Sequence, residues 1–418
     1  MNSEQSHSPP DAAAESPGDY LNALIASFLG WTLDAFDFFV LVFTIPAVAK
    51  DFQTDIPAVA GTIAVTLAFR PVGAFIFGLL ADRYGRRLPL MVNLVFYSVI
   101  EVLSGLAPDY TTFLVLRALF GIGMGGEWGV GASLVMEKVP PRWRGVLSGL
   151  LQEGYAVGYL LAACCYFTVF PSWGWRPMFF IGGLPALLAL FVRYRVKESA
   201  VWQRTRTESW GSLGKAIVSN WKLFLYLTVL MMMMNFASHG TQDMYPTLLK
   251  EQRGYSPRQV AVIAVIYNIG ALAGGITFGL MSDRFGRRRA MVTALLLAIA
   301  MIPLWAYAPG TISLVVGAFL IQFMVQGAWG VVPAHITELS PDSVRGFLPG
   351  FAYQCGVLLA GSVAYFEAVL ARHLNYATAM ALTALTVFVV GVIVIALGPE
   401  RRGAAFGATP RERKQPPE

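Results

Sequence analysis

Apolar residues in this chain form long stretches rather than the alternating runs expected of exposed β-strands. About 20 apolar residues are needed for a helix to cross a bilayer, and twelve such stretches follow one another. They lie near residues 21–48, 58–81, 88–107, 111–137, 144–169, 174–194, 221–249, 258–281, 289–308, 311–337, 345–369 and 375–397. The pattern predicts an all-α polytopic membrane protein with twelve transmembrane helices, because the strands of an outer-membrane barrel would alternate.

Composition supports this prediction. Of the 418 residues, 56% are hydrophobic and 13% are charged, whereas a soluble domain carries about 25% charged residues. So few charges cannot cover a water-facing surface, which argues against a soluble enzyme and a disordered protein. The three cysteines lie inside apolar runs without metal or disulfide spacing, so neither a metal site nor a cofactor is expected.

The basic residues lie mostly on one side of the predicted membrane. If both termini face the same side, the loops and tails there carry most of the 31 lysines and arginines. The positive-inside rule places this side in the cytoplasm, so we expect an integral protein of the plasma (inner) membrane with both termini inside. The asymmetry also explains the net charge of +6 without a nucleic-acid partner.

Polar segments divide the chain into two halves. We expect a cytoplasmic tail over 1–20, without the basic region of a cleavable signal peptide, and a six-helix half over 21–194. A basic linker at the membrane surface follows over 195–220, then a second six-helix half over 221–397. The final segment, 398–418, is rich in Arg, Pro and Gly and is expected to be a mobile cytoplasmic tail.

An internal repeat supports this division. The loop Gly-Leu-Leu-Ala-Asp-Arg-Tyr-Gly-Arg-Arg starts at Gly78, and Gly-Leu-Met-Ser-Asp-Arg-Phe-Gly-Arg-Arg starts 201 residues later at Gly279. A second motif recurs at the same offset, from Glu137 to Glu338. Both halves therefore have the same orientation, and their symmetry axis runs along the membrane normal.

The repeated loop, G-x-x-x-D-R-x-G-R-R, resembles the signature of the major facilitator superfamily. The resemblance implies two parallel-repeat six-helix halves and alternating access, with the loops as gates and braces. Its gating or structural residues would be Gly78, Asp82, Arg83, Gly85 and Arg86, and Gly279, Asp283, Arg284, Gly286 and Arg287. Residues 117–127 resemble the fourth-helix motif of proton- and metabolite-coupled members, which adds Arg117 and Glu127 to this set.

The seventh apolar stretch has a polar face. Asn235, Ser238, His239, Gln242 and Asp243 fall within an arc of about 140° on a helix. Lipid would not tolerate such a face, so it is expected to point into the bundle, where a role in function is favoured over packing alone.

The same segment is similar to the N-x-x-S/T-H-x-S/T-Q-D-x-x-x-T signature of Jen-type monocarboxylate transporters. These transporters belong to the sialate:proton symporter family. The resemblance implies proton-coupled movement of lactate, pyruvate or a similar short monocarboxylate. Because some relatives carry sialic acid, the motif leaves the size of the substrate open.

Arg70 is a basic residue deep in the second stretch. It precedes Asp82 by about 18 Å of helix, which places it near the middle of the bilayer. Its repeat counterpart is Ala271, so the charge is not shared by both halves. Binding of a substrate carboxylate and a fixed structural ion pair are the two interpretations.

Other embedded polar residues complete the predicted site. The substrate-binding candidates are Arg70, Asn235, His239, Gln242, Tyr155 and Gln354. The proton-coupling candidates are Asp34, Asp37, Glu153, His239 and Asp243. Weaker candidates for the lining are Glu127, Trp128, Tyr353, Asn268, Gln322 and Gln326. Asp34 and Asp37 could instead pair with Arg117 or Arg70.

The leading hypothesis is a proton-coupled symporter of a short monocarboxylate. Its partners would be a small organic anion, a proton and the lipid bilayer, and its functional unit would be a monomer. A carrier of sialic acid or another larger organic acid is the alternative. A non-transporting nutrient sensor is disfavoured, because such a sensor would usually carry a large cytoplasmic domain and the expected tails here are about 20 residues each. An enzyme or primary pump is disfavoured because no Walker loop or other catalytic motif is present.

Overall fold

The structure, a computed structural model, describes residues 17–206 and 209–407. Helices of the first half are α1 (Pro17–Asp51), α2 (Ile56–Tyr84), α3 (Arg87–Gly105), α4 (Tyr110–Lys138), α5 (Arg144–Gln152), α6 (Gly154–Thr168), α7 (Phe170–Trp173), α8 (Arg176–Ile181) and α9 (Pro185–Arg195). The connecting helices are α10 (Ala200–Thr205) and α11 (Trp210–Ser219). Helices of the second half are α12 (Trp221–Gln242), α13 (Tyr245–Thr247), α14 (Pro257–Phe285), α15 (Arg287–Tyr307), α16 (Thr311–Leu339), α17 (Leu348–Ala360), α18 (Val363–Ala371) and α19 (Tyr376–Leu397).

The all-α prediction is confirmed. Within the described residues, eleven helices are long and apolar enough to cross a membrane. The fifth predicted stretch is divided at Glu153 into α5 and α6, and together these two helices supply the remaining crossing. The seventh predicted stretch, 221–249, corresponds to a span over Trp221–Gln252. Within this span α12 ends at Gln242, shortly before Pro246, and α13 continues the crossing.

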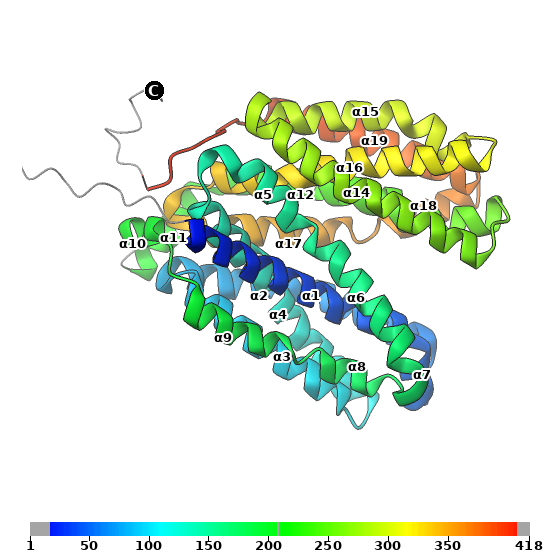
Figure 1. Ribbon diagram of the computed structural model, residues 1–418, viewed down its shortest axis with the longest axis horizontal. Coiled ribbons are helices and arrows are strands. Elements are labelled where there is room, and N and C mark those ends of the chain that lie inside the picture. The colour runs from blue at the N-terminus through cyan, green and yellow to red at the C-terminus, as the bar shows by residue number, and fades with distance from the viewer. Residues whose placement is uncertain (1–16, 207–208, 408–418) are drawn as a thin grey trace, which may run out of the picture.

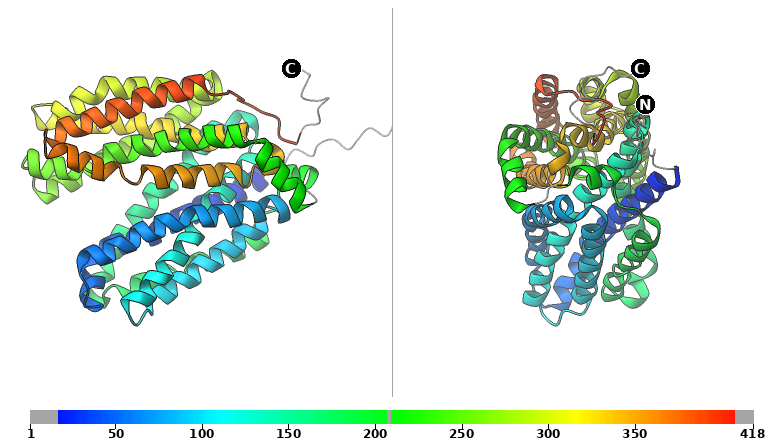
Figure 2. Two further views of the ribbon diagram at one scale, coloured as in Figure 1. Left: turned by 180° about the vertical axis from the view of Figure 1, so that it is seen from behind. Right: turned by 90° about the vertical axis from the view of Figure 1, so that its left-hand side faces the viewer.

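The helices form two bundles that diverge from one end of the molecule (Figures 1 and 2). We call the end where α1 begins and α19 finishes the terminal end, and the opposite end the open end. Between the halves, α2, α4 and α5 pack against α14, α16 and α17. The predicted linker contains α10 and α11, so its described part is largely helical.

Asp82 joins the first half to the second at the terminal end. Its carboxylate accepts hydrogen bonds from the backbone N–H groups of Gly346 and Phe347, at 2.7 and 2.9 Å. These amides lie directly before α17, where the helix dipole favours a negative charge. Arg86 pairs with Asp82 at 2.7 Å and with Glu137 at 2.8 Å, so the buried charges compensate one another.

The second signature loop repeats this arrangement. Asp283 accepts from the backbone N–H groups of Gly145 and Val146 at the start of α5, at 2.8 and 3.1 Å. Arg287 pairs with Asp283 at 2.7 Å and with Glu338 at 2.9 Å. The two halves thus hold each other through equivalent bonds in opposite directions.

The remaining loop residues shape the same joints. Gly85 and Gly286 end α2 and α14 with φ angles of 102° and 103°, which strongly favour glycine. Gly78 and Gly279 lie where the other half approaches: an added Cβ would lie 2.8 Å from the Phe347 Cα and 2.5 Å from the Gly145 carbonyl oxygen, respectively. Arg83 lies over the Tyr84 ring, and the Arg284 carbonyl oxygen accepts a hydrogen bond from Arg402.

The tail after α19 is packed, which corrects the expectation of mobility for residues 398–407. The Phe406 ring lies between the guanidinium groups of Arg144 and Arg345, at 3.7 and 3.8 Å. The Glu400 carboxylate accepts from the backbone N–H of Arg288 at 2.8 Å. The predicted tail residues 1–16 and 408–418 lie outside the described residues.

The signature aspartates should keep the terminal end closed. Asp82→Asn removes a buried charge that accepts two amide bonds, each worth about 1.5–3 kcal/mol. We expect the fraction of molecules that are open at the terminal end to rise at least about tenfold. The readout is maleimide labelling of Ala334→Cys, in a background without the native cysteines. Ala334 lies on α16 of the second half and is fully buried against the core of the first half.

Asp109→Asn is the matched control. Asp109 also accepts a backbone amide bond, at 2.9 Å from Thr112, but it is exposed at the start of α4, at the open end. Labelling should stay at the parent rate in this variant. Equal labelling of the Asp82→Asn variant and its parent would contradict the gate assignment.

Candidate functional site

Arg70 lies between the two halves and is only 4% exposed. Gly125 of α4 allows the close packing that encloses it, because an added Cβ there would lie 1.9 Å from the Arg70 carbonyl oxygen. Among the described residues, the Arg70 Nε and Nη2 atoms have no hydrogen-bond partner, and no carboxylate forms an ion pair with the side chain. A buried guanidinium with free donors suits an anionic guest.

Aromatic rings from both halves surround this charge. The guanidinium carbon of Arg70 lies 5.8 Å from the centre of the Tyr353 ring on α17. The Tyr353 ring packs against Trp128 of α4 at 4.5 Å and against Trp31 of α1 at 6.5 Å. Tyr155 of α6 lies 5.6 Å from Trp31. The indole Nε1 of Trp31 is buried and lacks a partner in the described chain, so it is a second free donor.

The polar face of α12 turns inward, as its periodicity predicts. Gln242 donates to the Gln322 side chain at 2.8 Å, and Ser238 accepts from Gln326 at 2.9 Å, so α16 satisfies part of the face. His239 lies 3.1 Å from Asp243, and both side chains are 40% exposed. Asn235 is instead buried and donates to its own helix backbone at Met231.

Arg70 lies close enough to groups of both halves for its charge to act on them. Its guanidinium acts electrostatically on the Asp34 carboxyl, the His239 ring and the Tyr353 hydroxyl. The structure therefore brings candidates from α1, α2, α12 and α17 into one site. We call this set of groups (Arg70, Asp34, Trp31, His239 and Tyr353) the central site.

Two other candidates lie where the two halves meet. Glu153, at the break between α5 and α6, faces Gly275 of α14, where an added Cβ would lie 2.3 Å from the carboxylate. Gln354 is fully buried and faces the Gly125 carbonyl oxygen at 3.5 Å. Both side chains lie at contacts between the halves, where they can respond to a change in the packing of the halves.

The first half encloses a group of buried carboxyl groups. Asp34 and Asp37 are fully buried, and Glu127 is 1% exposed. All six of their carboxyl oxygens lack hydrogen-bond partners in the described part of the chain. An ionised carboxylate without a partner is costly away from water, so such groups are suited to carry a proton. No ion pair joins Asp34 or Asp37 to Arg70 or Arg117 within the described ranges.

Arg117 pairs with Glu101, a residue that the sequence interpretation missed. The two side chains meet at 2.5 Å, both almost completely buried, and the Phe120 ring lies 4.6 Å from the guanidinium. Asp37 and Glu101 both flank Gly182, where an added Cβ would lie within 2.5 Å of each side chain. Arg117 therefore acts in the structure of the first half, next to the carboxyl groups.

Several further polar groups were missed. Glu101 is the only Asp, Glu, Lys, Arg or His in the stretch 88–107, a signal that could have identified it. Glu367 of α18 is 1% exposed, and its oxygens lack partners among the described residues. It lies 3.4 Å from the position of an added Cβ at Gly240, directly behind the polar face of α12. Trp31 gave no sequence signal, because an indole in an apolar helix usually packs in the core.

Fold and site together define a membrane transporter: two six-helix halves enclose a site of free donors and buried carboxyl groups. The chain belongs to the major facilitator superfamily. Residues 23–215 match the family model described as "Sugar (and other) transporter", and residues 243–417 match "Major Facilitator Superfamily". This membership makes the protein a transporter and not an enzyme.

Similar proteins cover nearly the whole chain. A probable 4-methylmuconolactone transporter of Cupriavidus pinatubonensis is 31% identical and is matched over 91% of each chain. The sialic acid transporter NanX of Escherichia coli is 30% identical, over 92% of this chain and 95% of NanX. A carboxylic acid transporter protein homolog of Saccharomyces cerevisiae is 28% identical, over 91% of this chain and 68% of the homolog.

A solved structure shares the fold. The proton:xylose symporter XylE superposes with a TM-score of 0.76 at 19% identity, over 93% of this chain and 98% of XylE. This likeness confirms the superfamily architecture of two six-helix halves.

The Arg117–Glu101 pair should be structural. Glu101→Gln leaves a buried guanidinium without a counter-charge, which should lower the free energy of unfolding by about 3–5 kcal/mol. The unfolding temperature in detergent should fall accordingly. Glu101→Gln/Arg117→Gln should recover most of this stability, because no charge remains uncompensated.

Asp51→Asn is the control for this comparison, because Asp51 forms an exposed pair with Arg176 at 2.9 Å. Its effect should stay below about 1 kcal/mol. The interpretation fails if the Glu101→Gln single variant is as stable as the parent.

Proposed function

We propose that this protein is a proton-coupled symporter of a small organic monocarboxylate such as lactate or pyruvate. The observation that carries the proposal is Arg70, a buried guanidinium with free donors and no counter-ion among the described residues. A substrate carboxylate supplies the missing charge. The aromatic rings around it suit the short apolar part of such an acid.

The Jen-type signature, which begins on α12 and ends at Thr247 of α13, supports a monocarboxylate. The similarity to the yeast carboxylic acid transporter homolog supports it as well. His239 and Gln242 lie on the polar face of α12 and can bind the other end of the substrate. Tyr155 borders the same site from α6. The competing substrate is a larger organic acid such as sialic acid, which the similarity to NanX favours.

Buried carboxyl groups are our candidates for the proton carrier. Asp34 is the first choice, because its unpartnered carboxyl lies within reach of the Arg70 charge. Bound together, the anion and the proton add no net charge, which reduces the cost of crossing the membrane. Asp37, Glu153, His239 and Asp243 are the alternatives.

We further propose that the terminal end faces the cytoplasm of the inner membrane, as the positive-inside rule indicates. The halves are joined at this end through Asp82 and Asp283 and diverge at the other. The described conformation is then the outward-facing one. Because the whole site lies within one chain, a monomer suffices for transport.

Uptake of labelled lactate, pyruvate, sialic acid and 4-methylmuconolactone into proteoliposomes tests the function. An inward proton gradient should drive accumulation of a short monocarboxylate. Arg70→Gln should weaken substrate affinity at least about tenfold, because it removes a charge-assisted fork. Arg176→Gln, at a half-buried arginine that pairs with Asp51 at the open end, should transport normally.

Two results would decide against this proposal. If no acid of the panel accumulates under the gradient, the function is wrong. If sialic acid accumulates while lactate neither accumulates nor competes, the larger substrate is correct.

An exchange assay distinguishes a residue that carries the proton from one that binds the substrate. Asp34→Asn should abolish accumulation driven by the gradient but retain exchange of labelled for unlabelled substrate, since exchange requires no release of the proton. The control is Asp55→Asn, which changes an exposed helix cap at the open end. Normal accumulation in Asp34→Asn would exclude Asp34 and transfer the role to one of the four alternatives.

A further inference from the structure

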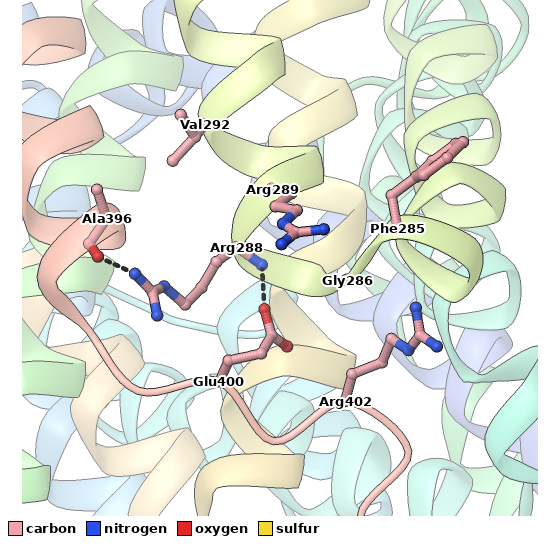
Figure 3. Close-up of a pocket in the computed structure, with 8 residues that line it drawn as sticks. All are labelled: Phe285, Gly286, Arg288, Arg289, Val292, Ala396, Glu400 and Arg402. Carbon is pink, nitrogen blue, oxygen red and sulfur yellow. Dashed lines mark hydrogen bonds between the residues drawn. The ribbon is translucent and has the colours of Figure 1, made fainter.

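A basic groove lies at the terminal end of the second half, outside the central site. It encloses about 560 Å³ and is lined by Phe285, Gly286, Arg288, Arg289, Val292, Ala396, Glu400 and Arg402. Figure 3 shows the three arginine side chains of this groove around the turn at Gly286. Three cationic side chains and one carboxylate leave an excess of positive charge.

The internal bonds of the groove leave Arg289 available. Glu400 is engaged by the backbone N–H groups of Arg287 and Arg288, at 3.3 and 2.8 Å. Arg288 donates to the backbone at Ile395, at 3.0 Å, and at Ala396, and Arg402 donates to the Arg284 carbonyl oxygen. The exposed Arg289 side chain has no hydrogen bond or ion pair with the described residues.

The internal repeat does not require this charge. At the 201-residue offset, the counterpart of Arg289 is Leu88. Glu198 accepts from the backbone of Arg86 and Arg87 as Glu400 accepts from that of Arg287 and Arg288, so the segment after α19 aligns at an offset of 202, which places Ala200 opposite Arg402. The charges of Arg289 and Arg402 are therefore not part of the bonding pattern that the two halves share.

An apolar track runs from the groove along the outside of the bundle. On α15, Arg289, Val292 and Leu296 share one face, and Leu296 is 51% exposed. On α19, Ile393 and Leu397 are likewise exposed, at 51% and 83%. A basic head site above two apolar helix faces matches the two parts of a phospholipid.

We propose that this groove binds the phosphate headgroup of an anionic phospholipid from the surrounding leaflet. Arg289 and Arg402 contact the phosphate, and the acyl chains lie along α15 and α19. Lipid bound there would bridge α15 and the segment after α19 at the joint that holds Glu400. The site is independent of the substrate and of the proton carrier.

The test measures lipid binding by native mass spectrometry on the delipidated full-length protein. The probes are phosphatidylglycerol, phosphatidylcholine with the same acyl chains, and soluble glycerol 3-phosphate. Phosphatidylglycerol should bind more tightly than phosphatidylcholine. Arg289→Gln and Arg402→Gln should each weaken its binding about fivefold, with phosphatidylcholine unaffected.

Arg142→Gln is the matched control, because it removes an exposed arginine at the same end, away from the groove. Its affinity for phosphatidylglycerol should equal that of the parent. Arg289→Leu introduces the residue type found at position 88 and should lose phosphatidylglycerol affinity as Arg289→Gln does. Unchanged unfolding temperatures would show that all variants are folded.

Three outcomes would overturn the proposal. One is equal affinity for phosphatidylglycerol and phosphatidylcholine. Another is a loss of phosphatidylglycerol affinity in the Arg142→Gln variant as large as that in Arg289→Gln. The third is displacement of phosphatidylglycerol by glycerol 3-phosphate at similar concentration, which would make the groove a site for soluble phosphate esters.

Discussion

A charge that is held away from water needs a partner, and this constraint organises the protein. Arg86, Arg287 and Arg117 each meet a carboxylate at 2.5–2.9 Å. These pairs brace the terminal end and the first half. Arg70 has no such carboxylate within the described residues, and Asp34 has no hydrogen-bond partner there. Arg70 and Asp34 are thus buried polar groups without a compensating partner in the described chain, unlike the three paired arginines. Our functional proposal rests on this difference.

The repeat separates bracing from function. Asp82 and Asp283 form equivalent bonds to the opposite half, so the symmetric residues hold the halves together. Functional candidates break the symmetry: Arg70 corresponds to Ala271, and Asp34 to Asn235. A structural device is needed in both halves, whereas one substrate and one proton need one site.

Much of the fold could be predicted from the sequence, and less of the site. Twelve apolar stretches and a loop at a fixed offset suffice for the architecture, because helix length and periodicity are local properties. The polar face of α12 was predicted for the same reason. Glu101 could have been singled out as a charge inside an apolar stretch, but its pairing with Arg117 depends on how two helices pack. Glu367 and Trp31 were missed because their surroundings come from residues far along the chain. The packing of Phe406 between Arg144 and Arg345 could not be predicted from a tail rich in Arg, Pro and Gly.

By itself, the sequence determined the class of protein, the two-half division and the small set of embedded charges. Each follows from the cost of transferring a residue from water to lipid, which depends on residue type and order. Only the tertiary structure decided which of those charges are paired. That decision depends on distances of a few ångströms between different helices: Arg117 is compensated by Glu101, while no carboxylate among the described residues pairs with Arg70.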